Sequence, residues 1–473
     1  MKNPILYFFL IISLGLKSQA PAIDYTDAFR LIEVWMEAQK DFQRLPSVSA
    51  AIVKDQEVIW SKAFGQAKIG GNQPASPSTI YSICSISKLF TAVAIMQLYD
   101  EGKLRLDDEI KTLLPSFDLK KTFPESGPIT IRSLLTHSSG LPRESDFPYW
   151  TGPDFPFPTS AQVTERLGSQ EMLYSASTNF QYSNLGITLL GQVVEKLSGK
   201  SYDDYVEDRI LKPLKLTSTH PNLPKTEWGK KMAIGYSAIK RDGSRDQVPL
   251  FDARGVKAAA GYASTVEDLA RFASWQFRLL TKGGTELLKA STLREMQRVQ
   301  WTDPDWKTTW GLGFAVSQQG NTTIVSHGGA CPGYRTTLQL DPKSKMAYTV
   351  MINAGGENPD MFAKELRDIF NKIPKSKPKS SENTNLAEYT GSYGVQPWFS
   401  EQVILPWYGD LAVLRLPNTN PDESMTILRL VSKDEFREVK GDEFVGGLFR
   451  FERNTSGKVI KLWSHSNSVT KLN

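Results

Sequence analysis

The chain has 473 residues, of which 40% are hydrophobic and 23% are charged, the proportions of a soluble globular protein. This length is long for a single hydrophobic core and predicts two domains. The net charge of +5 is small, and lysine and arginine are dispersed along the chain, so nucleic acid is excluded as an expected partner. Two cysteines and four scattered histidines form no ligand cluster, so we predict neither a metal site nor a cofactor.

Residues 1–22 have the pattern of a secretory signal peptide. Lys2 provides the positive start, an apolar segment runs from Ile5 to Leu16, and small residues around Ala20 and Ala22 suit cleavage. The apolar segment has about a dozen residues, whereas a helix needs roughly 20 to span a bilayer. We therefore predict an exported protein, secreted or periplasmic, without a stable membrane span.

The first elements after this segment are a helix and a hairpin. Residues 26–42 have helical periodicity. Apolar runs at 48–53 and 58–64, joined by a short polar segment at Asp55 and Gln56, predict two antiparallel strands.

Ser85 and Lys88 lie three residues apart at the start of a long apolar segment, which predicts a buried helix ending near Glu101 with Gly102 in the left-handed cap conformation. A serine hydroxyl becomes nucleophilic when a neighbour takes its proton, and a lysine amine held away from water can do so. Other Ser-x-x-Lys pairs lie in polar surroundings, where the amine stays protonated: Ser237/Lys240, Ser376/Lys379 and Ser468/Lys471.

The middle of the chain is predicted to be helical and rich in loops. Residues 149–159 are dense in proline, glycine and aromatic residues, and this loop either walls a cleft or covers the core. Tyr182 stands two residues before Asn184, directly ahead of a helical run at 187–197. Residues 265–268 have the pattern of a helix N-terminus with an acidic first turn.

Strand patterns return at 311–316, 322–325, 336–340 and 347–352, followed by a helix at 359–371. The second of these strands leads into His327, two glycines and Ala330. This order predicts an antiparallel sheet flanked by helices, with a helical subdomain inserted between its first and last strands.

The last part of the chain is predicted to be a separate unit. We divide the chain into the signal at 1–22, a first domain at 23–373, a basic linker at 374–385 and a small all-β domain at 386–473. The all-β prediction rests on short alternating runs separated by turn residues, at 403–405, 411–416, 425–431, 448–451 and 459–463.

Three motifs in this order, S-x-x-K at Ser85, Y-S-N at Tyr182 and H-G-G at His327, resemble those of the serine β-lactamase and penicillin-recognising superfamily. The last two forms are similar to the class C β-lactamase, D,D-peptidase, D-aminopeptidase and family VIII esterase branch. The resemblance extends from about residue 45 to residue 370 and implies the α/β (α+β) β-lactamase-like fold. The C-terminal unit resembles the lipocalin-like β-barrels that follow such domains.

The resemblance implies a role for each motif residue. Ser85 is the expected nucleophile, and Lys88 with Tyr182 forms the base system; which of the two takes the serine proton is left open. Asn184 is expected to orient Lys88 and the substrate amide. The backbone N–H groups of Ser85 and Ala330 are the expected donors to the oxyanion.

The third motif departs from the K-T-G form of the superfamily. His327 stands where the lysine would be, and Gly328 replaces the threonine whose hydroxyl helps to hold a substrate carboxylate. We expect His327 and Gly329 to orient the substrate. In the family fold Cys84 and Cys331 are neighbours, and an oxidising compartment favours a disulfide between them, with two buried free thiols as the alternative.

These inferences together predict an exported serine hydrolase that forms an acyl-enzyme with a small-molecule or peptide substrate. D-amino-acid peptides and amides or small esters are the expected substrates. A true β-lactamase or D,D-carboxypeptidase is the first alternative. A non-catalytic protein that binds a cell-wall ligand on the same fold is the second. The oligomeric state is left open.

Overall fold

The structure is a computed structural model that describes residues 24–120, 122–374, 385–394, 397, 400–440 and 445–472. The predicted signal peptide and most of the predicted linker therefore lie outside the described residues, and the domain division stays a prediction. Within the described part of the chain, no helix has the length and apolar character needed to cross a membrane.

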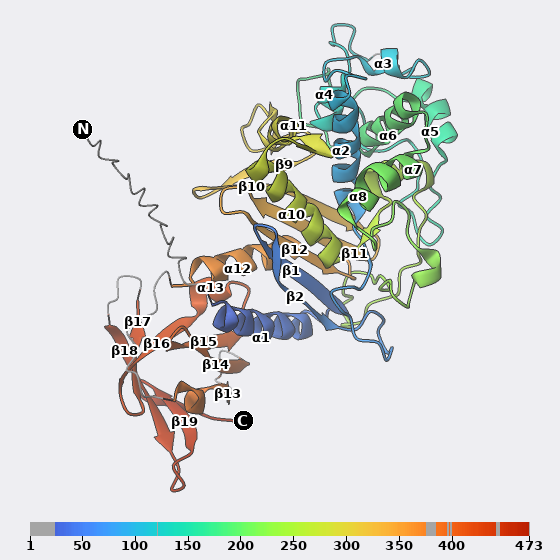
Figure 1. Cartoon of the computed structure of the whole chain (residues 1–473). Helices are drawn as coiled ribbons and strands as arrows, with labels where there is room; N and C mark the ends of the chain where they lie inside the picture. The colour runs from blue at the N-terminus through green and yellow to red at the C-terminus, as the bar shows by residue number, and fades with distance from the viewer. Residues whose placement is uncertain are drawn as a thin grey trace, which may run out of the picture.

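Two eight-stranded antiparallel sheets organise the molecule (Figure 1). The first sheet joins the two ends of the N-terminal region, because the first strand pairs with the last one formed before residue 373. Its strands, in spatial order, are β2 (Glu57–Gly65), β1 (Ser47–Lys54), β12 (Met346–Ile352), β11 (Tyr334–Asp341), β10 (Thr322–Cys331), β9 (Ala315–Gln319), β8 (Thr309–Trp310) and β7 (Trp301–Thr302).

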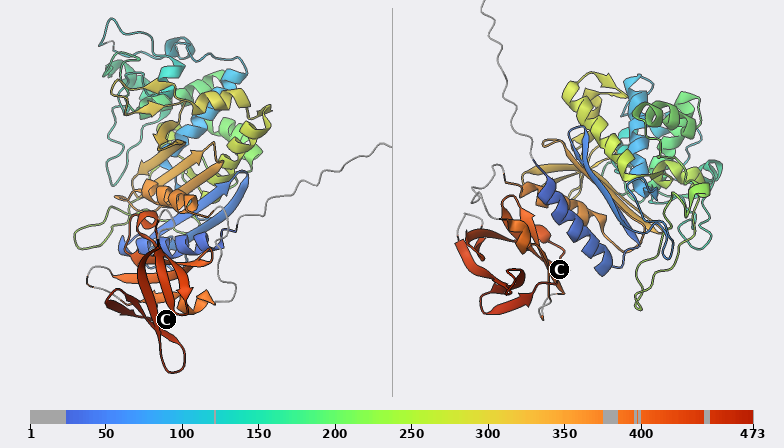
Figure 2. Two further views of the ribbon diagram at one scale, coloured as in Figure 1. Left: turned by 90° about the vertical axis from the view of Figure 1, so that its left-hand side faces the viewer. Right: turned by 60° about the horizontal axis from the view of Figure 1, so that its bottom comes forward.

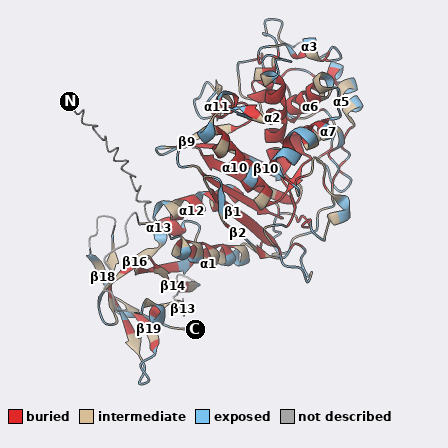
Figure 3. Cartoon of the chain, in the orientation of Figure 1, coloured by how far each residue is buried: buried red, intermediate tan, exposed pale blue. Residues whose placement is uncertain are grey.

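Helices cover both faces of this sheet. Helices α1 (Thr26–Phe42) and α12 (Pro359–Asn371) lie on one face, and α10 (Val266–Lys282) lies on the other. Strand β1 is buried over nearly its whole length, because side chains that alternate along a strand here meet a helix on each side. Its apolar run at 48–53 is explained by this double burial, which Figure 3 shows in red for the central strands, whereas the edge strand β2 is only partly buried.

The helical subdomain is built around α2 (Ser87–Asp100). Every residue of α2 from Ser87 to Leu98 is buried, which fits a helix that is apolar on all sides. Helices α6 (Asn184–Ser198) and α9 (Lys257–Ala260) pack against it. Shorter helices complete this part of the molecule: α3 (Ile110–Leu113), α4 (Ile131–Leu135), α5 (Ser160–Arg166), α7 (Tyr202–Val206), α8 (Lys212–Leu214) and α11 (Ala290–Gln297).

The second sheet follows chain order, with each strand beside the next. Backbone hydrogen bonds from Leu472 to Ser392 (2.8 Å) and from Gly394 to Thr470 (2.7 Å) bring its ends together, so the sheet forms a nearly closed barrel. Its strands are β13 (Gly391–Tyr393), β14 (Glu401–Trp407), β15 (Asp410–Leu416), β16 (Thr426–Ser432), β17 (Glu435–Val439), β18 (Val445–Arg453), β19 (Val459–Ser464) and β20 (Asn467–Thr470). Aromatic side chains fill its interior: Tyr389, Tyr393, Phe436, Phe449 and Phe451.

Helix α1 lies between the two sheets, as the views in Figure 2 show. Trp35 on this helix belongs to a hydrophobic cluster that also contains Leu405 and Leu414 of the barrel and Val48 of the first sheet. The Trp35 indole N–H donates to the Asn418 carbonyl (2.8 Å). The two units therefore share a core across α1 rather than being joined only by a linker.

Most predicted elements match the structure. The helices predicted at 26–42 and 359–371 are α1 and α12, and the predicted hairpin is β1 and β2. The strand predicted at 311–316 is wrong in its bounds: β8 ends at Trp310 and β9 begins at Ala315. Gly313 has a φ of 85° there, so the chain turns between the two strands instead of extending.

Candidate active site

Ser85 lies in a short 3₁₀ turn, Cys84–Ile86, which leads directly into α2. Cys84 has a φ of 51°, a conformation that side-chain-bearing residues adopt at a cost and that often accompanies functional sites. The turn places Ser85 beside β10, and it lines the same cleft as Gly329 and Ala330. The predicted nucleophile therefore lies next to the third motif.

Lys88 is fully buried, one turn after Ser85. Its ammonium nitrogen, Nζ, donates to the Ser85 hydroxyl oxygen (3.1 Å) and to the Ala259 carbonyl of α9 (2.7 Å). Burial lowers the pKa of Lys88 well below its ordinary value of 10.5. A neutral amine in this position can accept the proton of the serine hydroxyl.

The Tyr182 side chain lies at the Ser85 hydroxyl, which acts on the pKa of the phenol, and both residues line the cleft. Removal of its hydroxyl from water raises the pKa of Tyr182 above 10, so the phenol keeps its proton at neutral pH. Lys88 Nζ and the Arg143 guanidinium carbon each lie 4.9 Å from the centre of the Tyr182 ring. The hydroxyl of Ser85 is thus contacted by both members of the predicted base system.

Asn184 is buried at the start of α6, but its amide is not hydrogen-bonded to Lys88. Asn184 Nδ2 donates to both carboxylate oxygens of Glu144 (2.9 and 3.0 Å). Its amide oxygen is buried without a hydrogen-bond partner among the described residues. Sequence reasoning missed Glu144, which belongs to none of the three motifs.

His327 is buried on β10, where its Nδ1 lies 2.7 Å from the Gly328 carbonyl. A carbonyl only accepts, so Nδ1 carries the proton and Nε2 is left as an acceptor. Nε2 has no partner among the described residues. Burial and the neighbouring Lys88 lower the pKa of His327 to about 3, so the imidazole is neutral.

The two glycines of the third motif have different surroundings. A Cβ atom on Gly329 would lie 2.3 Å from the Ile83 carbonyl and 2.2 Å from the Thr336 hydroxyl, so only glycine allows β10 to approach the Ser85 turn this closely. A Cβ atom on Gly328 would meet nothing closer than the Thr336 carbonyl at 3.8 Å. Position 328 therefore has room for a side chain that this protein does not supply.

Cys84 and Cys331 form a disulfide with Cα atoms 5.7 Å apart. This is the pairing expected from the sequence, and it joins the residue before Ser85 to the last residue of β10. The bridge thus links the element that carries the candidate nucleophile to the strand that carries the Ala330 N–H.

Aromatic rings line the cleft beside Tyr182. Trp310 stands edge-on to His327 (ring centres 5.7 Å apart) and to His137 (5.3 Å), and His137 lies 4.3 Å from the Tyr182 ring. The Trp310 indole nitrogen is buried without a partner among the described residues. Trp310 was not predicted as a site residue, because its strand has only two residues and no pattern.

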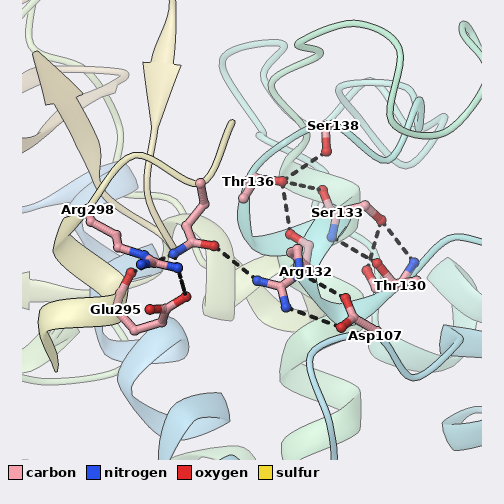
Figure 4. A network of polar contacts seen from close by, with 9 residues as sticks. Asp107, Thr130, Arg132, Ser133, Thr136, Ser138, Glu295 and Arg298 are labelled. Atoms are coloured by element: carbon pink, nitrogen blue, oxygen red, sulfur yellow. Dashed lines mark hydrogen bonds and ion pairs between the residues drawn. The ribbon is translucent and has the colours of Figure 1, made fainter. Parts of the chain in front are cut away.

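A polar network braces the loop that carries His137 (Figure 4). Arg132 on α4 donates to Asp107 (2.8 and 3.2 Å) and to Gln300 (3.0 Å), and the Thr136 hydroxyl donates to the Arg132 carbonyl (2.9 Å). These bonds tie the loop to the segments before α3 and after α11.

The cleft has a volume of about 440 Å³. A second cavity of about 470 Å³ lies near α3 and contains none of the predicted site residues. The lining of the first comprises Ser85, Arg143, Tyr182, Trp310, the 327–330 segment, Arg335, Thr336 and the 357–360 segment.

Two curated proteins are similar in sequence to most of this chain. The chain is 28% identical to Beta-lactamase-like protein 2 of Dictyostelium discoideum over 345 residues, which are 72% of this chain and 61% of that protein. It is 26% identical to protein flp of Staphylococcus aureus (strain NCTC 8325 / PS 47) over 374 residues, 78% of this chain and 71% of that one.

Solved structures show the same fold. An octameric penicillin-binding protein homologue from Pyrococcus abyssi is similar over 94% of this chain and 100% of that one (TM-score 0.63, 24% identity). A D-amino acid amidase from Ochrobactrum anthropi SV3 is similar over 73% of this chain and 97% of that one (TM-score 0.60, 23% identity). The Beta-lactamase family matches residues 33–369, more than half of the sequence. The chain belongs to the Beta-lactamase family.

Proposed function

We propose that this protein is an exported serine hydrolase that forms an acyl-enzyme on Ser85. The observation that carries the proposal is the pairing of the Ser85 hydroxyl with a fully buried lysine, 3.1 Å away, whose pKa is lowered by burial. Lys88 is assigned as the immediate base, because burial favours the neutral form of its amine, whereas burial keeps the Tyr182 phenol protonated.

The reaction has two halves. Lys88 Nζ takes the Ser85 proton as the serine oxygen bonds to the substrate carbonyl carbon, and the backbone N–H groups of Ser85 and Ala330 hold the oxyanion. The bond to the leaving group then breaks. Tyr182 donates its proton to that group and regains one from Lys88. Water next attacks the acyl carbon, Lys88 takes the proton of the water, and Ser85 leaves with a proton returned by the same groups.

We propose D-amino-acid amides and peptides or small esters as the substrates. Two features of the third motif support this choice over β-lactams. Gly328 provides no hydroxyl for a carboxylate, and the neutral His327 provides no positive charge where K-T-G proteins have lysine. Two proteins of the same fold, a D-stereospecific amidohydrolase from Streptomyces sp. and a D-amino acid amidase from Ochrobactrum anthropi SV3, agree with this choice.

Export is proposed from the signal pattern at 1–22 and is supported by the Cys84–Cys331 disulfide, since such bonds persist in oxidising compartments. N-terminal sequencing of protein recovered outside the cytoplasm should start close to residue 21 or 23. Recovery of the full-length chain from the cytoplasm alone would contradict export.

A substrate panel tests the activity. The mature protein should turn over p-nitrophenyl butyrate or D-Ala-p-nitroanilide faster than nitrocefin, with a D-Ala-D-Ala peptide as the carboxypeptidase probe and the Ser85→Ala variant as the blank. Nitrocefin turnover above the other rates would restore the β-lactamase alternative. Failure of all substrates, together with no labelling of Ser85 by a fluorophosphonate, would support the non-catalytic alternative.

A further inference from the structure

Glu144 is a carboxylate at the edge of the site that none of the three motifs contains. Its oxygens accept hydrogen bonds from Asn184 Nδ2, from the Tyr149 hydroxyl and from the Trp150 indole N–H (3.3 Å). Arg143 Nε lies 3.2 Å from the same carboxylate. The Glu144 side chain thus contacts a residue of the second motif, two aromatic residues and a cationic neighbour.

The aromatic side of this group is rigid. Tyr149 is buried, and its ring centre lies 4.7 Å from that of Phe157, which stacks on Phe251 at 5.4 Å. Trp150 stands edge-on to Phe157 at 5.0 Å. The loop at 149–159, which the sequence left as either a cleft wall or a core cover, therefore provides a packed support for the Glu144 carboxylate.

The backbone of Glu144 is held as well as its side chain. The Gln170 amide donates to the Glu144 carbonyl (3.0 Å). Because both its backbone and its side chain are hydrogen-bonded, Glu144 fixes the position of Asn184 on α6 relative to the aromatic loop.

The partner of Glu144 on α6 is Asn184, whose side-chain amide has a donor end, Nδ2, and an acceptor end, the oxygen. Because Nδ2 is engaged by both oxygens of Glu144, the amide cannot exchange its nitrogen and oxygen without losing these bonds. The amide oxygen stays buried and available as an acceptor. The charge of Glu144 thus determines which end of the Asn184 amide is free.

The negative charge of Glu144 also acts on Lys88. Burial is the largest cause of the lowered pKa of Lys88, the negative charge of Glu144 opposes it, and the positive charge of Arg143 adds to it. The other titratable groups around Lys88 are Tyr182 before α6, His327 on β10 and His137 after α4. Burial lowers the pKa of both histidines, so neither contributes a charge at neutral pH.

We propose that Glu144 is a positioning residue that holds Asn184 against the aromatic loop and, with Arg143, sets the balance of charge around Lys88. The inference rests on the proposed function, since it assumes that Lys88 must be neutral to activate Ser85. Glu144 touches neither the nucleophile nor the base in this structure, so it acts through its neighbours.

The test compares Glu144→Gln with Arg143→Gln, two neutralising changes of opposite sign at adjacent positions. The readout is the rate of fluorophosphonate labelling of Ser85 as a function of pH, which needs no knowledge of the natural substrate. Loss of Glu144 removes an attraction for the Lys88 ammonium, so its pKa falls and the acidic limb of the profile moves to lower pH. Loss of Arg143 removes a repulsion, so the limb moves to higher pH.

We expect the Glu144→Gln rate at its own optimum to be lower than wild type by about 10–100-fold, the scale at which small misplacements act. Tyr149→Phe is the matched control: it removes one bond to Glu144 but no charge, so the limb should stay at its wild-type pH. Melting curves establish that each variant is folded.

Three results would overturn the inference. The first is that the acidic limb of the labelling profile moves in the same direction in Glu144→Gln and Arg143→Gln. The second is that the limb does not move in Glu144→Gln. The third is that Tyr149→Phe moves the limb as far as Glu144→Gln does. Wild-type protein that is not labelled at Ser85 at any pH would contradict the proposed function itself, and this inference with it.

Discussion

The two eight-stranded sheets differ in the surroundings of their buried polar groups. At the cleft beside the first sheet, His327, Trp310 and Asn184 each keep a buried polar atom without a partner among the described residues. In the barrel the Tyr389 hydroxyl donates to Asp434 (2.9 Å) and the Tyr393 hydroxyl to the Tyr389 carbonyl (2.7 Å), while the Tyr408 hydroxyl at the β14–β15 turn has no partner among the described residues. A buried polar atom without a partner lowers the free energy of unfolding by about 1–3 kcal/mol. The cleft therefore reduces the stability of the folded protein, and a bound ligand would supply the missing hydrogen bonds.

The sheets also differ in how the chain builds them. The barrel is a meander in which each strand pairs with the next, so its strand pairings are local in sequence except where its two ends meet at Ser392 and Leu472. The first sheet brings together residues far apart, as the disulfide between Cys84 and Cys331 shows with its separation of 247 residues. A site assembled from distant segments is the region where substitutions should change chemistry, and the barrel is the region where they should change only stability.

The largest expected effect is the loss of turnover in Ser85→Ala, because no other group in the cleft takes the place of its hydroxyl. Knockout of a comparable nucleophile lowers kcat by about 10⁶-fold. Ser237→Ala is the control, since Ser237 also lies in a Ser-x-x-Lys pair but caps a surface turn and accepts from the Asp246 N–H (2.9 Å). Turnover and fluorophosphonate labelling should vanish in the first variant and persist in the second; labelling at Ser237 would refute the assignment.

The next prediction compares a tyrosine at the cleft with a tyrosine in the barrel. Tyr182→Phe should lower kcat by about 10²–10⁴-fold, the usual contribution of a proton-transfer group, with little change in melting temperature. Tyr389→Phe in the barrel loses the part-buried hydrogen bonds of its hydroxyl with Asp434 and Arg453 and should lower the free energy of unfolding by about 1 kcal/mol with activity unchanged. A loss of activity below tenfold in Tyr182→Phe would make Tyr182 a packing residue and weaken the contrast.

The parts of the site that could be read from the sequence are those with a local signal. Ser85 and Lys88 are one helical turn apart, and Tyr182 directly precedes a helix, so their spacing was visible. Glu144 was missed because its partner lies 40 residues away and its loop has no periodicity. Trp310 was missed because two glycines at 311 and 313 interrupt the strand pattern.

The same reasoning applies to the barrel. Strand β14 was found at its apolar centre, because most of its residues are buried. Strand β17 was missed because only Phe436 is buried in it, so the sequence shows no alternation. Strand β20 was missed for the same reason, with Val469 as its one buried residue.

The third prediction concerns the disulfide that joins the Ser85 turn to β10. Replacing both Cys84 and Cys331 by serine should lower the free energy of unfolding by about 2–5 kcal/mol, because the closed loop is long. Activity should fall before stability does when native protein is reduced, since the bridge sets the distance between the Ser85 turn and β10. Mass spectrometry of unreduced protein should find one linked peptide pair; two freely alkylated thiols in exported protein would refute it.

The smallest predicted effect lies at the junction of the two units. Glu365 on α12 is fully buried, and its Oε2 has no partner among the described residues; Asp422 of α13 (Pro421–Ser424) likewise keeps Oδ1 unpaired. Burial raises the pKa of Glu365 from 4.5 to about 7, with the Asp422 carboxyl adding to the rise and Lys364 (3.0 Å) opposing it. One proton shared by the two carboxyls would pair both free oxygens.

The sign of the pH dependence follows from this shift. The folded protein binds the Glu365 proton more tightly than the unfolded chain does, so its stabilisation is complete below pH 4.5 and is lost as the pH rises through about 7. Glu365→Gln keeps a donor for Asp422 at every pH. Its melting temperature should therefore exceed that of wild type by about 2–4 °C above pH 8, with no gain near pH 4. Equal melting temperatures of the variant and wild type at both pH values would show that Glu365 and Asp422 share no proton.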